Sequence, residues 1–304
     1  MLLLQQMIVL FIYMLIGYIA CKKDMLDAKA GQKLSWIVVN VANPSLIISS
    51  AVNEEGKITG DKLLLTVAIA IAMYILLLLL AKIIPWIFKV PHKDHGIYKV
   101  MSVFNNIGFM GFPVIAAVYG KSALLYGAVF MIPYNVLIYT YGIQILKGTN
   151  GEKETFQIKK ILNIGVLACV LAAVLYISKF PVPQFARAAA EGLSNLTGPL
   201  SMIVIGISMT KIPLGELFTD IRLLIFSAVK LLVIPILGML IIKQFVTDEI
   251  LCGVCMVMLA TPVGSMTAML AQQYGGDQET VTKGVSLTTI LSVITIPVVS
   301  AIVL

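Results

Sequence analysis

The chain has 304 residues, of which 59% are hydrophobic and 12% are charged, and its mean hydropathy is +0.98. Soluble domains are about a quarter charged and about half apolar, so this chain could not cover a globular surface with polar groups, and a water-soluble protein is excluded. The net charge of +7 does not indicate nucleic-acid binding, because the basic residues lie in short clusters between apolar runs, as they do in the cytoplasmic loops of membrane proteins.

Ten apolar runs are long enough to cross a membrane, whose hydrocarbon core of about 30 Å needs about 20 residues of helix. The first run begins without a basic segment and is followed by Lys22 and Lys23, so it predicts a retained helix, not a signal peptide or a lipoprotein signal ending at Cys21. The predicted helices 1 to 10 cover residues 3–20, 34–51, 63–88, 97–118, 122–146, 161–178, 188–209, 221–242, 250–272 and 281–303.

The basic residues of the loops predict the orientation. The loops after the odd-numbered helices hold 15 Lys and Arg, those after the even-numbered helices hold 6, and Lys230 lies inside helix 8. By the positive-inside rule the odd-numbered loops are cytoplasmic. The chain is therefore predicted to be a multi-pass protein of the cell (inner or plasma) membrane with both termini outside the cytoplasm.

A shift of 155 residues lays helices 1–5 over helices 6–10 and aligns Asn40 with Asn195 and Pro44 with Pro199. Since each half has an odd number of helices, the second half would cross the membrane upside down, as in the inverted repeats of transporters. The sequence thus predicts an all-α fold of two inverted five-helix repeats, residues 1–148 and 149–304. A chance alignment of apolar runs is the alternative.

Helices 4 and 9 are interrupted by stretches rich in glycine and proline, at residues 105–113 and 261–267. Proline removes a backbone donor and glycine lets the chain leave helical geometry, but unwound backbone survives in a membrane only inside protein or against water. We expect both helices to be discontinuous and to cross near the midplane, where half-helix N-termini favour a carboxylate; a proline kink is the alternative. The predicted site comprises Asn105, Asn106, Gly108, Gly111, Pro113, Thr261, Pro262, Gly264, Ser265 and Thr267.

Helices 2 and 7 carry weaker signals of the same kind, at residues 40–45 and 195–199, which combine asparagine or glycine with proline. A kink and a functional unwinding explain these segments equally well. The functional interpretation adds Asn40, Asn43 and Asn195 to the candidate substrate-binding residues.

No Asp or Glu lies in the middle of a predicted helix, whereas Lys230 lies in the middle of helix 8. A lysine there costs about 2.5–3.5 kcal/mol, so it either neutralises an anionic substrate or pairs with carbonyls exposed by a broken helix. A buried cation without a buried acid favours a small organic anion as cargo over a cation. No cofactor is expected beyond a coupling H⁺ or Na⁺, the latter held by carbonyls, Asn side chains, Ser265 and Thr267.

Two further motifs have the spacing of metal or redox sites. Cys252 and Cys255 lie in an apolar helix without a matching pair, and His92 and His95 lie in a basic loop, so buried thiols and a solvated loop are predicted instead of a metal site. Ser265 has no histidine partner in a helix, so no catalytic residue is predicted. A receptor would not require matched breaks in two helices.

The residues Asn43-Pro44, the pattern at 105–113 and the proline at 262 resemble the auxin efflux carrier family over essentially the whole chain. This family comprises the bacterial relatives of plant PIN proteins, several of them called malate permeases. The resemblance implies a scaffold of helices 1, 2, 6 and 7, a transport domain of helices 3–5 and 8–10 that moves like an elevator, small organic acids as cargo, and a homodimer.

Within this family pattern Pro113 and Pro262 match the prolines of the crossing, and Asn105 and Asn106 match polar positions of the substrate site. The segment at 147–160 is short where plant members have a long loop, so no regulatory function of that loop carries over. The pattern does not identify the substrate. A sodium-coupled carrier of the bile-acid or antiporter type remains the alternative transporter.

Overall fold

The computed structural model of the chain describes residues 2–52, 60–147, 163–274 and 276–304. The polar loops at 53–56 and 148–151, and with them the predicted boundary between the two halves, lie outside these residues. The described residues form helices joined by short connections, and their one isolated β-bridge pairs Asn105 with Val263. The all-α prediction is confirmed.

The first part of the chain contains seven long or medium helices and one short one. They are α1 (Leu2–Lys22), α2 (Ala28–Ile37), α3 (Asn43–Val52), α4 (Gly60–Ile87), α5 (His95–Val103), α6 (Phe112–Tyr119), α7 (Leu124–Leu137) and α8 (Ile143–Lys147). Wide π-helical turns and tighter 3₁₀ turns lie between them. The π-helical turns are η1 (Val38–Ala42), η3 (Ile107–Gly111) and η5 (Ile138–Gly142), and the 3₁₀ turns are η2 (His92–Asp94) and η4 (Lys121–Ala123).

The second part follows a similar order. Its helices are α10 (Ile164–Ser178), α11 (Gln184–Ser194), α12 (Thr197–Met209), α13 (Leu214–Leu217), α14 (Ile221–Ala228), α15 (Ile234–Ile242), α16 (Glu249–Ala260), α17 (Ser265–Tyr274) and α18 (Gln278–Val303). The π-helical turn η6 (Val229–Val233) joins α14 to α15, so that these three elements form one continuous span.

Seven helical stretches of the described chain are long and apolar enough to cross a membrane, and three shorter apolar helices accompany them. The seven are Leu3–Lys22, Ala28–Val52, Gly60–Ile87, Lys121–Lys147, Gln184–Met209, Ile221–Ile242 and Gln278–Val303, and the three are Ile107–Tyr119, Ile164–Ser178 and Glu249–Ala260. The prediction of a polytopic membrane protein is confirmed. That the halves form an inverted repeat of ten spans stays a prediction.

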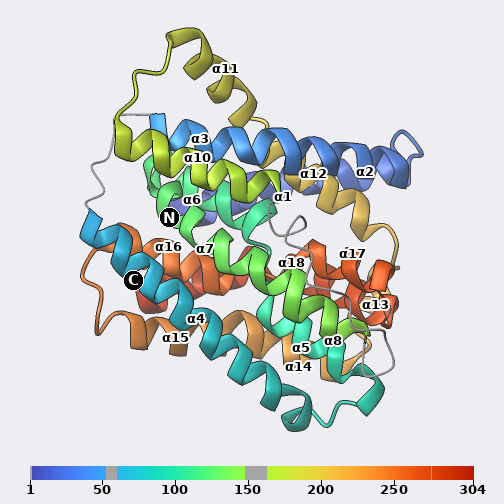
Figure 1. Cartoon of the computed structure of the whole chain (residues 1–304). Helices are drawn as coiled ribbons and strands as arrows, with labels where there is room; N and C mark the ends of the chain where they lie inside the picture. The colour runs from blue at the N-terminus through green and yellow to red at the C-terminus, as the bar shows by residue number, and fades with distance from the viewer. Residues whose placement is uncertain (1, 53–59, 148–162, 275) are drawn as a thin grey trace.

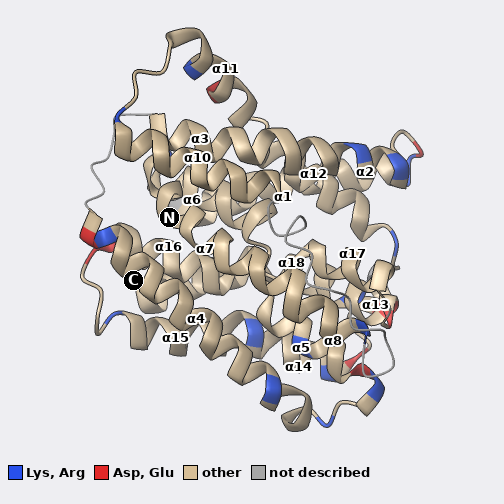
Figure 2. Ribbon diagram, viewed as in Figure 1, with Lys and Arg blue, Asp and Glu red and all other residues tan. Residues whose placement is uncertain are grey.

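The outward faces of the helices are apolar. On α4, Ile71, Ile75 and Leu79 recur at helical spacing with 50%, 53% and 51% of their surface exposed. Because a soluble protein rarely leaves so continuous an apolar face in water, this face is one that lipid covers. Lys, Arg, Asp and Glu lie mostly toward the two ends of the bundle and in the connections (Figure 2).

Two groups of helices make up the bundle (Figure 1). In one, which we call the α1/α12 group (α1–α3 and α10–α12), α1 and α2 pack on α12 while α3 packs on α10 and α11. In the other, the crossing group (α4–α8 and α14–α18), α4 packs on α5 and α7, α15 on α16, and α17 on α18. The two marked chain ends lie at the same end of the bundle (Figure 1).

Helices α1 and α12 approach each other so closely that glycine is required on both. A Cβ on Gly17 would lie 2.2 Å from the carbonyl oxygen of Ile203, and a Cβ on Gly206 would lie 2.0 Å from the carbonyl oxygen of Met14. Small residues allow this backbone contact between membrane helices, where packing replaces the hydrophobic effect. The α1–α12 contact is therefore a tight seam within its group.

Helix 2 is not unwound at residues 40–45. The span continues from α2 to α3 through η1, in which the N–H of Asn43 bonds the carbonyl of Val38, five residues back. The wide turn alters the carbonyl spacing ahead of Pro44, whose ring would clash in a regular helix. The kink alternative therefore describes helix 2, whereas helix 7 is interrupted for two residues between α11 and α12.

Candidate functional site

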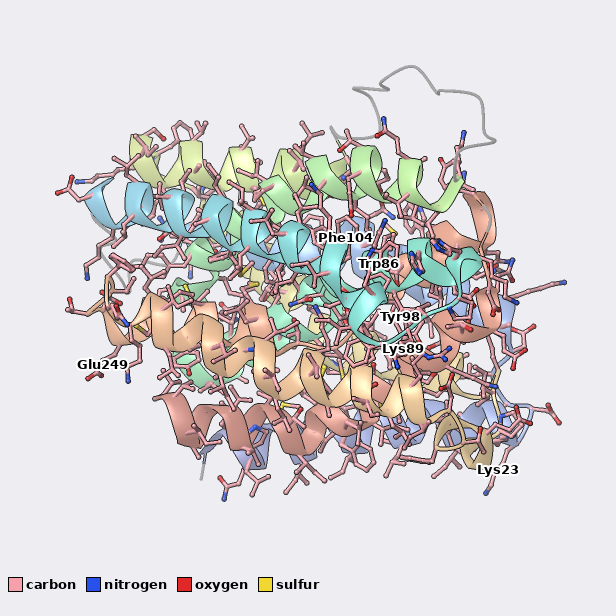
Figure 3. The ribbon with its side chains drawn as sticks, turned by 90° about the horizontal axis from the view of Figure 1, so that it is seen from below. Lys23, Trp86, Lys89, Tyr98, Phe104 and Glu249 are labelled. Carbon is pink, nitrogen blue, oxygen red and sulfur yellow. The ribbon has the colours of Figure 1, made fainter. Side chains whose placement is uncertain are left out.

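The predicted helix 4 (97–118) is split into α5 and η3–α6, and the predicted helix 9 (250–272) is split into α16 and α17. The two breaks lie against each other. The N–H of Asn106 donates to the carbonyl of Pro262 at 2.8 Å, and the N–H of Gly264 donates to the carbonyl of Phe104 at 2.8 Å. Phe104 lies between the two ends of the bundle (Figure 3). This antiparallel pairing confirms that helices 4 and 9 are broken and cross.

The crossing leaves little room for a side chain at Gly264. A Cβ there would lie 3.0 Å from the carbonyl oxygen of Asn105 and 3.2 Å from that of Phe104. The neighbouring N–H of Val263 is satisfied by the hydroxyl of Thr288, at 3.1 Å, so that α18 supports the break from a third direction. A Cβ on Gly111 would lie 3.6 Å from Cγ2 of Thr261, an ordinary contact distance.

Asn105 repairs the hydrogen bonds that Pro262 breaks. Because proline has no N–H, the carbonyl of Met258, four residues earlier, loses its helical partner. The side-chain Nδ2 of Asn105 donates to this carbonyl at 2.6 Å and to that of Leu259 at 3.2 Å. Both amide hydrogens of Asn105 are thus used within the protein, and the residue joins α5 to the C-terminal end of α16.

Lys230 is fully buried in η6 and points at the same place. Its Nζ donates to the carbonyl oxygen of Ser102 at 2.6 Å and to Oδ1 of Asn105. Of the two roles considered for this lysine, the geometry supports pairing with a carbonyl exposed by a broken helix.

Four buried polar side-chain atoms in or near η1, η3 and α12 have no hydrogen-bond partner among the residues that the structure describes. They are Nδ2 of Asn106, Oδ1 of Asn43, Oγ1 of Thr197 and Oγ of Ser201, all in residues less than 9% exposed. The amide of Asn43 lies against Gly108, 3.4 Å from the position of a Cβ there, and α12 packs on η3. An unsatisfied buried polar group costs about 1–3 kcal/mol, so these four atoms are candidates to meet a polar ligand or water.

A cavity of about 200 Å³ lies next to the crossing, between α12, α17 and α18. It is lined by Ser35, Phe109, Val204, Ser208, Lys211, Ser265, Ala268, Met269, Gln272, Gln278, Thr282, Val285 and Ser286. Lys211 is the one charged residue among them. Pockets for drug-sized ligands measure about 300–1,000 Å³, so this cavity suits a smaller polar molecule.

Ser265 connects the cavity to the crossing, because it is the first residue of α17 and its buried Oγ has no partner. Two residues on, the N–H and Oγ1 of Thr267 both donate to the carbonyl of Gly264, at 2.9 and 2.6 Å. The N-terminal ends of η3–α6 and α17 carry partial positive charge and no acidic residue lines the cavity. Pro113, near the start of α6, lies close to Gly198 at the start of α12, where an added Cβ would lie 3.7 Å from Cβ of Pro113.

Two predicted residues are not brought to the crossing. Nδ2 of Asn40 donates to the carbonyl of Trp36 in its own helix at 2.9 Å. Asn195 is exposed at the far end of α12 from the cavity, where its Oδ1 accepts from Nζ of Lys121 at 3.2 Å. The same ammonium bonds Glu191 at 3.0 Å.

The sequence analysis did not name Thr197 and Ser201 as site residues, nor, apart from Ser265, the cavity residues of α17 and α18. A signal was present, since Thr197 and Ser201 are four residues apart and share one face of an apolar helix. The cavity residues are dispersed over five elements, so no local pattern joins them.

The spaced cysteines and histidines form no site within the described chain. Cys252 and Cys255 are buried free thiols, and the rings of His92 and His95 stack at 4.5 Å. Among the described residues no group of three or more His, Cys, Asp and Glu is arranged to hold a metal ion.

The chain is similar to known proteins over nearly its whole length. The family model described as "Membrane transport protein" matches residues 2–300. An uncharacterized transporter of Methanocaldococcus jannaschii is 26% identical over 302 residues, which cover 95% of each chain. An uncharacterized transporter of Methanothermobacter thermautotrophicus is 25% identical over 292 residues, covering 94% of this chain and 93% of its own.

Proposed function

Because the chain belongs to the membrane transport protein family, we propose that it is a secondary carrier for a small organic anion, such as a mono- or dicarboxylate. The observation that carries the proposal is the cavity of about 200 Å³ that reaches the start of α17 and has Lys211 as its one charged lining residue. A carboxylate in it would meet hydroxyl and amide donors, an ammonium group and a half-helix N-terminus, but no acidic side chain.

The unpartnered polar atoms at the crossing extend this site toward the α1/α12 group. Nδ2 of Asn106 is a free donor, and the hydroxyls of Thr197, Ser201 and Ser265 can each donate to a carboxylate oxygen. Binding of the anion would satisfy groups that otherwise stay desolvated and unpaired. The cargo site proposed here therefore lies between η3, α12 and α17.

The transport cycle proposed here moves the crossing group against the α1/α12 group in an elevator-like motion. Supporting it, the cavity opens at one end of α12, beside Lys211, while Lys121 bonds Glu191 and Asn195 at the other end. With the predicted orientation in the cell membrane, Lys211 lies in a cytoplasmic loop and the cavity faces the cytoplasm.

The resemblance to the auxin efflux carriers also leads us to propose a homodimer. Light scattering of the protein purified in detergent tests this directly. The expected protein mass is that of two chains of 32.9 kDa, and a mass of one chain would contradict it.

A thermal-shift screen of small carboxylates, followed by uptake into liposomes, tests the proposed function. A bound cargo raises the melting temperature by mass action. Replacing Asn106 or Pro262 by alanine is expected to lower uptake of the stabilising anion at least about tenfold, the effect of about 1.4 kcal/mol of lost binding, without unfolding the protein.

The matched control is Asn40→Ala, which removes an amide that bonds only the carbonyl of Trp36 in its own helix. We expect it to transport like the wild type. Full transport by both Asn106→Ala and Pro262→Ala would rule out the site at the crossing.

A further inference from the structure

Two half-helices end at the crossing with carbonyl groups that have lost their helical partners. The carbonyl of Ser102 would bond the N–H of Asn106 in an unbroken helix, but that N–H donates to Pro262 instead. The carbonyl of Met258 faces Pro262, which has no N–H. The C-terminal ends of α5 and α16 thus meet inside the bundle, each with partial negative charge.

One cation serves both helix ends. Nζ of Lys230 donates directly to Ser102 of α5, and through Oδ1 of Asn105 it reaches the carbonyls of Met258 and Leu259 on α16. The lysine is fully buried. The ion pairs found among the described residues do not include it, so its negative partners are the two helix ends and the amide between them.

Such a set of oxygens has the chemistry of a monovalent-cation site. In transporters with broken helices, unwound carbonyls and half-helix C-terminal ends are the groups that coordinate Na⁺. Here the ammonium of Lys230, a residue of the π-helical turn η6, lies at that position. Single π-helical turns within α-helices are frequently found at functional sites.

We propose that Lys230 is a tethered counter-ion, which takes the position that a metal cation would otherwise occupy and makes the crossing independent of Na⁺. The lysine is a positioning residue, because it touches the backbone of the crossing and not the cargo. Insofar as it predicts transport that does not need Na⁺, the inference rests on the proposed function. The stability of the crossing can be measured without any cargo, so a failure of this inference can be distinguished from a failure of the proposed function.

The test measures the melting temperature of the purified protein in chloride salts of choline, Na⁺ and methylammonium at equal ionic strength. We expect the wild type to melt at the same temperature in all three. Lys230→Ala should melt several degrees lower in choline and recover saturably with methylammonium or Na⁺, because either cation can enter the vacated space.

The matched control is Lys243→Ala, since Nζ of Lys243 also bonds a helix-end carbonyl, that of Val303 at 2.9 Å, but away from the crossing. It should show no cation-specific recovery. The inference is overturned if Na⁺ saturably stabilises the wild type relative to choline, or if no cation restores Lys230→Ala beyond this control. If Lys230→Ala does not fold, the wild-type comparison decides alone, with Na⁺ independence supporting the inference.

Discussion

Asn105 and Asn106 are adjacent and chemically identical, yet the structure gives them opposite surroundings. The amide of Asn105 is consumed by Met258, Leu259 and Lys230, whereas Nδ2 of Asn106 has no partner. Adjacent residues of an extended segment point to opposite sides. One asparagine therefore holds the crossing together, and the other is free to meet a ligand.

Replacing Gly264 by alanine tests how closely the two broken helices must approach each other at the crossing. Its replacement by alanine would place a Cβ 3.0 Å from the carbonyl oxygen of Asn105, so the two backbone segments would have to separate. We expect Gly264→Ala to melt at a lower temperature and to lose uptake. The control is Gly192→Ala in α11, which meets nothing within 4 Å and should keep or raise the melting temperature.

The sequence predicted which residues lie at the crossing, but not which of their side chains are bonded within the protein and which are left unpartnered. Proline and glycine mark a break because their backbone properties are local, so the segments at 105–113 and 261–267 could be identified without a structure. Which asparagine is left without a partner, and which way Lys230 points, depends on how α14, α16 and η3 are rotated against one another. Hydropathy does not give that rotation, because these elements consist mostly of apolar residues.

At the scale of the elements, the membrane spans follow from length and apolarity alone, which is why their positions could be predicted along the whole described chain. The sequence did not show whether a proline ends a helix or only bends it. At Pro262 the chain leaves the helix, whereas at Pro44 the turn η1 absorbs the ring and the helix continues. The difference lies in neighbours distant in sequence, since a second broken segment supplies hydrogen-bond partners only at Pro262.

The N-terminal ends of α4 and α16 are joined by a second kind of contact, the ion pair of Lys62 with Asp248, the N-cap residue of α16. Partial burial alone would raise the pKa of Asp248, but the hydrogen bonds from Lys62 and from the backbone N–H of Leu251 outweigh it and hold the pKa below its usual range. A group of this kind stabilises the fold above its unfolded pKa of about 3.9 and loses that effect as the pH falls through the folded pKa.

Asp248→Asn should therefore melt slightly lower than the wild type at pH 7, with a loss of at most about 1 kcal/mol for an exposed pair, and the difference should shrink as the pH falls below the unfolded pKa of about 3.9. Asparagine keeps the helix cap, so the change isolates the charge. The control is Asp27→Asn, whose carboxylate accepts from Ala30 within its own helix. A difference that persists unchanged at low pH would contradict this explanation.

At the scale of the whole molecule, the cavity lies at one end of α12, and the contacts of Lys121 with Glu191 and Asn195 lie at the other. Ser208 lines the cavity and Lys121 lies at the opposite end of α12, so the variants Ser208→Cys and Lys121→Cys report on access to the two ends. In sealed vesicles we expect a membrane-impermeant maleimide to label Ser208→Cys from the cytoplasmic side only, with protection by the bound carboxylate, and Lys121→Cys from the other side.

The parent protein, with its four native cysteines, gives the background labelling. Equal labelling of Ser208→Cys from both sides would contradict a cavity that opens to one side. Such access could not be predicted from the sequence, because it depends on how α12, α17 and α18 pack around the cavity.

The long sequence separations at the crossing have a consequence for how the protein is made. The partners of the Asn105 amide lie 153 and 154 residues further along the chain, and Lys230 lies 125 residues beyond Asn105. While the ribosome is still extending the chain, the open carbonyl of Ser102 lacks Lys230 and the amide of Asn105 lacks its acceptors. Polar backbone in hydrocarbon costs several kcal/mol per group. Helix 4 must therefore stay in water, in the translocon or in an unbroken helical form until the second half has entered the membrane.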